Sequence, residues 1–198
     1  MAVRSILRIG DPRLRQVAEP VDAYDTPDLH ELIEDMFDTM AAADGAGLAA
    51  TQIGVIKQVM IFGVESTPRY PDIEPVPTTV LINPEFSVLS DEVAGFWEGC
   101  LSVPDLRGLV PRPREVRVDY LGLDGQAESI TADGFLSTVL QHELDHLEGL
   151  LFIDRMRDMT KLATIEDYRK YWLQLDDDDA GIDEDGSADV DGNVDTQV

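Results

Sequence analysis

Two of the three histidines in this chain stand four residues apart, in the segment QHELDHLEG at residues 141–149. They are His142 and His146, and Glu143 directly follows the first of them. Residues four apart on a helix project from the same face, so both imidazoles could bind one metal ion. Glu143 would lie beside them, within reach of a proton on a metal-bound water molecule. The pattern therefore predicts a metal site with Glu143 as its acid–base group.

A catalytic metal site usually has three protein ligands, so a third ligand must come from elsewhere in the chain. One candidate is Cys100, the only cysteine, in the segment EGCLSVP at residues 98–104. The other candidate is Glu166, on a later predicted helix, because some metallopeptidases take an acidic third ligand from such a helix. The residue types by themselves leave both candidates open.

The elements that must position these residues form an α+β pattern. Apolar periodicity predicts a helix at residues 26–45, a helix that carries QHELDHLEG, and an amphipathic helix at residues 162–175. Strands are predicted at residues 58–64, 79–89, 115–121 and 127–131. We therefore expect mostly antiparallel strands packed around a central, metal-binding helix, with an N-terminal and a C-terminal helix.

Charge and composition limit the location and the domain organisation. The formal net charge of −25 argues against a broad nucleic-acid-binding surface. Residues 176–198 carry ten acidic and no basic residues, so we expect a catalytic domain at residues 1–175 followed by a disordered acidic tail. The sequence has neither a long apolar run nor a signal-peptide pattern, and its single cysteine needs no oxidising compartment. A cytoplasmic location without membrane contact is expected.

Three segments, in this order, resemble the signature motifs of the peptide deformylases. They are GAGLAATQ at residues 45–52, EGCLSVP at 98–104 and QHELDHLEG at 141–149, and the resemblance extends over about residues 5–170. It implies a hydrolase that removes the N-formyl group from the initiator methionine of new polypeptides and releases formate. It also implies one divalent metal ion, iron(II) in the native enzyme, with zinc, nickel or cobalt as substitutes.

The resemblance also implies roles for individual residues. Cys100, His142 and His146 become the metal ligands. Glu143 becomes the general acid/base that serves a metal-bound hydroxide attacking the formyl carbon. The Gln52 side chain and the Leu101 backbone N–H become the donors that stabilise the developing negative oxygen. By the same analogy five residues bind the substrate: Ala46, Gly47, Gly99, Val139 and Arg107.

The expected partner is an N-formylmethionyl nascent peptide. A ribosome would be a further partner, but a basic docking helix is not evident and the acidic tail would be repelled by ribosomal RNA. Two other readings compete: an endopeptidase with Glu166 as third ligand, and a non-catalytic, metal-stabilised binding protein. The first leaves GAGLAATQ and EGCLSVP without a role, and the second leaves Glu143 and Gln52 without one.

Overall fold

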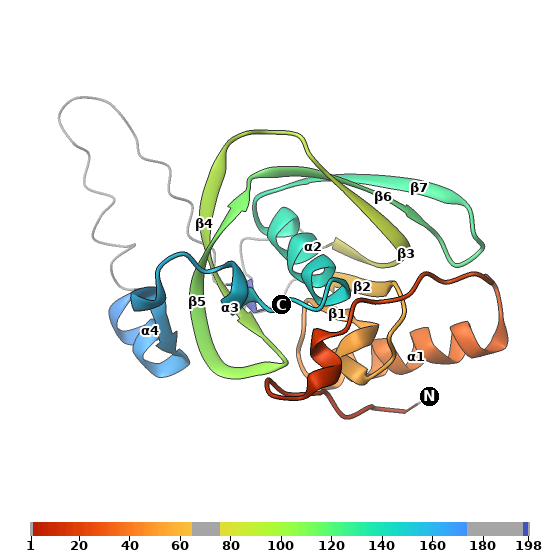
Figure 1. Cartoon of the computed structure of the whole chain (residues 1–198), viewed down its shortest axis with the longest axis horizontal. Coiled ribbons are helices and arrows are strands. Elements are labelled where there is room, and N and C mark those ends of the chain that lie inside the picture. The colour runs from red at the N-terminus through yellow and green to blue at the C-terminus, as the bar shows by residue number, and fades with distance from the viewer. Residues whose placement is uncertain (1, 65–75, 174–195, 198) are drawn as a thin grey trace.

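The computed structural model describes residues 2–64, 76–173 and 196–197, and in this part of the chain it contains two β-sheets and four α-helices (Figure 1). One sheet has five antiparallel strands in the order β1-β2-β3-β6-β7. The other has the order β8-β5-β4-β9, in which β9 alone pairs in parallel with its neighbour. The fold class is α+β with mostly antiparallel strands, as the sequence predicted.

The strands of the first sheet are β1 (Gly47–Ala49), β2 (Val59–Val64), β3 (Val76–Val88), β6 (Glu115–Leu121) and β7 (Ala127–Asp133). Those of the second are β4 (Val93–Cys100), β5 (Val103–Pro113), β8 (Leu162–Thr164) and β9 (Thr196–Gln197). The α-helices are α1 (Pro27–Ala42), α2 (Gly134–Leu147), α3 (Phe152–Arg155) and α4 (Ile165–Tyr171), and short 3₁₀ helices cover Pro12–Arg15, Ala50–Ile53 and Met159–Lys161. The four predicted strands correspond to β2, β3, β6 and β7, with ends that differ by three residues or fewer.

Helix α1 begins where the sequence indicates and ends slightly earlier. The Thr26 side chain accepts a hydrogen bond from the Leu29 backbone N–H, and Pro27 occupies the first helical position. Its buried apolar side chains include Leu29, Ile33 and Met36, which follow the helical period. The helix ends at Ala42, before the predicted end at residue 45.

Helix α2 carries the QHELDH residues and contacts strands of both sheets. Eleven of its 14 residues are buried, including Val139, His142, Glu143 and His146. A helix buried on all sides cannot show the simple amphipathic pattern of a surface helix. Its polar side chains must therefore find partners inside the protein.

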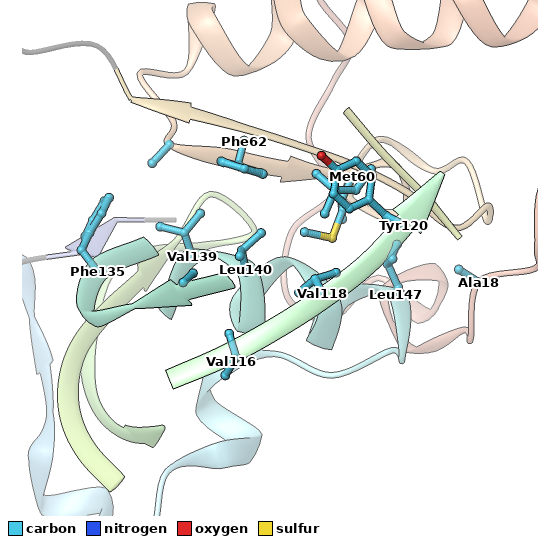
Figure 2. Close-up of a cluster of buried hydrophobic side chains, with 14 residues drawn as sticks. Ala18, Met60, Phe62, Val116, Val118, Tyr120, Phe135, Val139, Leu140 and Leu147 are labelled. Atoms are coloured by element: carbon cyan, nitrogen blue, oxygen red, sulfur yellow. The ribbon is translucent and has the colours of Figure 1, made fainter. Parts of the chain in front are cut away.

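The main hydrophobic core lies between α2 and the five-stranded sheet (Figure 2). Figure 2 shows Val139 and Leu140 of α2 pointing toward Phe62 of β2, and Leu147 beside Val118 of β6. These side chains are apolar and almost fully buried, so the hydrophobic effect holds α2 on this sheet. The core thereby fixes the direction in which the opposite face of α2 points.

The β4–β5 hairpin was missed by sequence analysis, because no strand was predicted on either side of EGCLSVP. Its register pairs Phe96 with Val110 and Cys100 with Val103, with an irregularity between Glu98 and Cys100. All five residues at the end of β4 are buried, so the two-residue alternation of a half-exposed strand is absent. Buried polar side chains such as Glu98 also interrupt the apolar run from which a buried strand would be predicted.

The predicted C-terminal helix at residues 162–175 is shorter than expected. Leu162–Thr164 form β8, which pairs with Leu106 to Gly108 of β5. Helix α4 then begins at Ile165, because the Thr164 side chain accepts a hydrogen bond from the Asp167 N–H and caps it. The pairing of β8 with β5 depends on a distant segment, so local periodicity could not indicate it.

The predicted acidic tail at residues 176–198 lies outside the described residues, apart from Thr196 and Gln197 in β9. Its disorder and the domain boundary at residue 175 therefore stay predictions. Within the described ranges, no helix is both long enough and apolar enough to cross a membrane.

Candidate active site

The structure brings together the three predicted metal ligands. Cys100 ends β4, while His142 and His146 lie one turn apart on α2. One potential ligand atom from each lies within 4.8 Å of the others, and Cys100 Sγ is 3.2 Å from His146 Nε2. All three side chains are buried, with exposures of 1% each. Strand β4 and helix α2 are therefore the two elements that build the site.

Unpartnered polar atoms in this cluster indicate that it fits a metal ion. His142 Nε2 and both carboxylate oxygens of Glu143 are buried and have no hydrogen-bond partner among the described residues. Leaving such groups buried and unpaired costs several kcal/mol in a protein interior. One thiol and two imidazoles are donors suited to zinc or iron(II), and Glu143 lies beside them as an acid–base group. The donor set and the unpaired atoms thus agree with a bound divalent ion.

Glu98 orients His142 and was not assigned a role from the sequence. Its Oε2 lies 2.8 Å from His142 Nδ1, and the guanidinium of Arg112 donates to both of its oxygens at 2.7 and 3.0 Å. An ionised carboxylate can only accept, so Nδ1 carries the proton and Nε2 keeps a free lone pair. The available sequence signal was only that an acidic residue, Glu98, stands two positions before Cys100 in EGCLSVP.

Neighbouring charged side chains lower the pKa values of Glu98 and Cys100. Burial raises the pKa of the Glu98 carboxyl, but the positive charge of Arg112 and the hydrogen bond from His142 outweigh burial and lower the pKa to about 2. Burial likewise raises the pKa of the Cys100 thiol, but the charges of His146 and His142 hold it well below its usual range. The Ser102 backbone N–H, 3.3 Å from Sγ, also favours the thiolate. A thiolate is the form that binds a metal.

The pKa of Glu143 is raised, whereas those of Glu98 and Cys100 are lowered. Burial raises the pKa of its carboxyl to about 7, although His146 and His142 act to lower it. A carboxyl with a pKa near neutrality can accept and return a proton efficiently. The side chain packs against Gly47, where an added Cβ would lie 2.6 Å from Glu143 Oε1. The absence of a side chain at Gly47 therefore makes room for the carboxylate.

Gln52 lies in the 3₁₀ helix Ala50–Ile53 and points toward Cys100. Its Oε1 accepts a hydrogen bond from the Ala49 N–H at 2.8 Å, which orients the amide so that Nε2 lies 3.7 Å from Cys100 Sγ. Nε2 also donates to the Ser102 hydroxyl at 3.3 Å. Leu101, the other predicted oxyanion donor, follows Cys100 in the β4–β5 turn and is 9% exposed. Both predicted donors thus lie next to Cys100.

The predicted substrate-binding residues lie around the same cluster. Ala46 and Val139 are buried in the main core, and Val139 lies on α2 one turn before His142. Arg107 covers Gly99 so closely that a Cβ on Gly99 would lie 1.8 Å from its Nη1. The edge of β4 at Glu98 and Gly99 pairs with β9, so this edge can accept an added strand.

Glu166, the alternative third ligand, lies away from the cluster. It is exposed on α4 and borders a surface groove with Arg169 and Lys170. The group of described residues that could hold a metal ion contains Cys100 and the two histidines without Glu166. The geometry therefore favours Cys100 over Glu166 as the third ligand.

Known proteins are similar to this chain in sequence. Residues 3–162 match the family model for polypeptide deformylase. Peptide deformylase 1 of Bordetella pertussis is 56% identical over 166 residues, which is 83% of this chain and 93% of the relative. Peptide deformylase 1 of Nitrosomonas europaea is 53% identical over 163 residues, 81% of this chain and 92% of the relative.

Solved structures of peptide deformylases are also similar to this chain. The Met-Ala-Ser-bound crystal structure of a class I type b peptide deformylase from Acinetobacter baumannii has a TM-score of 0.75 and 39% identity. That match covers 78% of this chain and 99% of the other. A peptide deformylase of Synechococcus elongatus in complex with actinonin has a TM-score of 0.72 and 37% identity, over 80% of this chain and 81% of the other.

Proposed function

The chain belongs to the polypeptide deformylase family, and from this premise we propose that it removes the N-formyl group from the formylmethionine of newly made polypeptides. The observation that carries the proposal is the buried Cys100–His142–His146 cluster with Glu143 beside it. The Met-Ala-Ser peptide bound by the Acinetobacter baumannii relative is what such a reaction would release from formyl-Met-Ala-Ser. The chain is accordingly a hydrolase that acts on a linear amide.

We propose that Cys100, His142 and His146 hold one divalent ion, with iron(II) as the native metal. When bound, the ion supplies Lewis acidity that lowers the pKa of water toward neutrality. A thiolate with two neutral imidazoles leaves a divalent ion with a net positive charge and suits iron(II) as well as zinc. The hydrogen bond from the Ser102 N–H to Cys100 Sγ and the orientation of His142 by Glu98 support this ligand set.

Glu143 moves the proton. It accepts a proton from the attacking water as the new bond to the formyl carbon forms, and returns it to the amine nitrogen as the C–N bond breaks. Formate and a free N-terminal amine are the products. The pKa of about 7 supports this role, because the carboxyl can hold either protonation state near neutral pH.

Gln52 and Leu101 would stabilise the negative oxygen that develops on the formyl group. The Gln52 amide is held by the Ala49 N–H before any substrate arrives, and such prior orientation makes an oxyanion donor effective. The Leu101 backbone N–H directly follows Cys100 in a tight turn. Removal of one such donor typically costs about 3 kcal/mol of transition-state stabilisation.

The substrate backbone would lie along Ala46 and Gly47 on one side and Gly99 on the other, by strand addition to the β4 edge. Val139 would contact the methionine side chain, and Arg107 would support the peptide beside Gly99. The pairing of β9 with Glu98 and Gly99 supports this geometry, because it shows an extended segment paired with this edge.

The direct test is formate release from a formyl-Met-Ala-Ser peptide, with protein purified without oxygen and loaded with iron(II) or nickel(II). We expect Glu143→Gln to keep its metal but lose about a hundredfold or more in kcat, since it removes the acid–base group. Cys100→Ser should lose both metal and activity. Glu166→Ala is the matched control and should retain both.

Absence of formate release by the fully metal-loaded wild type would overturn the proposal. Metal loss in Glu166→Ala together with activity in Cys100→Ser would instead support the endopeptidase reading. Cleavage of internal peptide bonds, detected by mass spectrometry in the same assay, would identify that activity.

A further inference from the structure

A chain of buried charges connects His142 to the protein surface. Beyond Glu98, the Arg112 guanidinium donates from Nη1 to Asp145 Oδ2 at 2.6 Å. The other oxygen of Asp145 accepts from Arg155 Nε at 3.0 Å and from Arg155 Nη2 at 2.6 Å. Arg155 is the last residue of α3, and its side chain is 43% exposed. The charge chain therefore runs from His142 through Glu98, Arg112 and Asp145 to Arg155.

Arg155 balances the charge of the buried part of this chain. Glu98, Arg112 and Asp145 are almost fully buried, and the two carboxylates share the Arg112 guanidinium, so Arg155 supplies a second positive charge to this set. Two carboxylates that share one cation compete for it, so loss of Arg155 would strengthen the pull of Asp145 on Arg112. Arg112 would then hold Glu98 less firmly. Breaking one partner of a buried ion pair is costly for this reason.

Asp145 borders a cavity on one side. Arg112, Asp145 and Arg155 border a cavity of about 440 Å³, whose other walls include Phe86 and Pro113. Arg112 holds one oxygen of Asp145, and the two hydrogen bonds from Arg155 hold the other oxygen. The contact differs from an ordinary surface ion pair, in which both partners are exposed and the energetic contribution is small.

We propose that Arg155 is a positioning residue that acts on the metal site through Asp145, Arg112 and Glu98. This inference rests on the proposed function only in its link to the reaction. The structural part of the inference is independent of the reaction: the hydrogen bonds from Arg155 determine how rigidly Glu98 orients His142 toward a metal ion. Partners that orient a metal-binding histidine typically change metal affinity about 10- to 100-fold when removed, and Arg155 lies further out, so a smaller effect is expected.

The test compares Arg155→Ala, Arg155→Lys and Arg114→Ala in the cobalt(II)-loaded full chain. Arg114 is the matched control, because its side chain is 44% exposed and pairs with the 60% exposed Glu92 on the surface. The readouts are the visible absorption spectrum of bound cobalt, the rate of cobalt loss to excess chelator, the melting temperature and formate release. The spectrum reports ligand geometry, which general destabilisation of the fold would not change.

We expect Arg155→Ala to lose cobalt about three- to tenfold faster, with an altered spectrum and a lower kcat. Arg155→Lys should recover part of the loss because it restores the charge but not both hydrogen bonds. Arg114→Ala should match the wild type. If Arg155→Ala does not fold, Arg155→Gln provides the same comparison.

An unchanged spectrum and wild-type cobalt loss in Arg155→Ala would overturn the inference, and so would an equal effect in Arg114→Ala. These metal readouts do not depend on the reaction. A wild type that releases no formate would therefore refute the proposed function, while the spectra and loss rates would still decide the role of Arg155.

Discussion

Glu143 shows how one side chain depends on its immediate neighbours. Its carboxylate is fully buried, and burial raises its pKa to about 7. The space it occupies exists because residue 47 is glycine. At this scale the chemistry follows from burial, from nearby charges and from the absence of one methyl group.

The Gly47→Ala substitution tests this packing. An added Cβ would lie 2.6 Å from Glu143 Oε1 and 2.9 Å from Cδ, so the carboxylate must move. We expect kcat/KM for formate release to fall by about 10- to 100-fold, because misplacement by about 1 Å has costs of this size. Metal content should stay unchanged, since no predicted ligand moves.

Gly95→Ala is the control for this substitution, because its Cβ would meet the flexible end of Leu109 at 3.2 Å. Wild-type kcat/KM in Gly47→Ala, at full metal content, would show that Glu143 tolerates displacement.

At the scale of elements, the N-terminal segment joins three parts of the fold. The Ala2 N–H and the Arg4 Nε–H donate to Asp35 on α1, at 2.6 and 2.7 Å. Further along, the Leu7 N–H donates to the Gln52 carbonyl at 2.8 Å, and the Ile9 N–H to the Ser102 carbonyl at 2.7 Å. The segment thus ties α1 to the two turns that present Gln52 and Leu101.

Asp35→Asn should weaken this tie in a pH-dependent way. The hydrogen bond from Arg4 lowers the pKa of Asp35 in the folded state, although desolvation opposes it. A lowered pKa contributes stability at pH values above the unfolded pKa, and this contribution is lost as pH falls toward the folded value. We expect a lower melting temperature at pH 7 and a smaller difference from wild type near pH 3.

Glu34→Gln, on the exposed side of α1, is the control and should melt like the wild type at neutral pH. A melting difference between Asp35→Asn and wild type that is equal at both pH values would contradict the ionic explanation.

At the scale of the whole molecule, the cluster of Cys100, His142 and His146 joins two layers. Cys100 comes from β4 of the second sheet, whereas His142 and His146 come from α2, which packs on the first sheet. A ligand that binds only the folded state stabilises it, by about 4 kcal/mol when its concentration is a thousand times Kd. The proposed metal ion would therefore stabilise the arrangement of both layers.

Metal removal should accordingly lower the melting temperature. We expect a chelator-treated wild type to melt several degrees below the metal-loaded form and to exchange amide hydrogens faster around Cys100 and the end of α2. Cys100→Ser should melt at the same temperature with and without chelator. Identical melting of treated and untreated wild type, with metal loss verified, would contradict this expectation.

Local patterns in the sequence were sufficient to predict part of the fold and part of the candidate site. Capping residues and apolar periodicity located α1, and turn residues and apolar runs located β2, β3, β6 and β7. The four-residue spacing of His142 and His146 located two neighbouring donors, because helical geometry depends only on nearby residues. The three motifs together also indicated the family, which the comparisons confirmed.

The tertiary structure alone decided which distant residues meet. It revealed the charge chain from Glu98 to Arg155, and it placed Cys100 beside the histidines, as the three-motif resemblance had implied but the residue types alone had left open. Charged residues normally indicate exposed positions, so buried ion pairs cannot be recognised from one sequence. Their burial depends on how the β4–β5 hairpin packs on α2, and that packing results from long-range contacts that local periodicity does not encode.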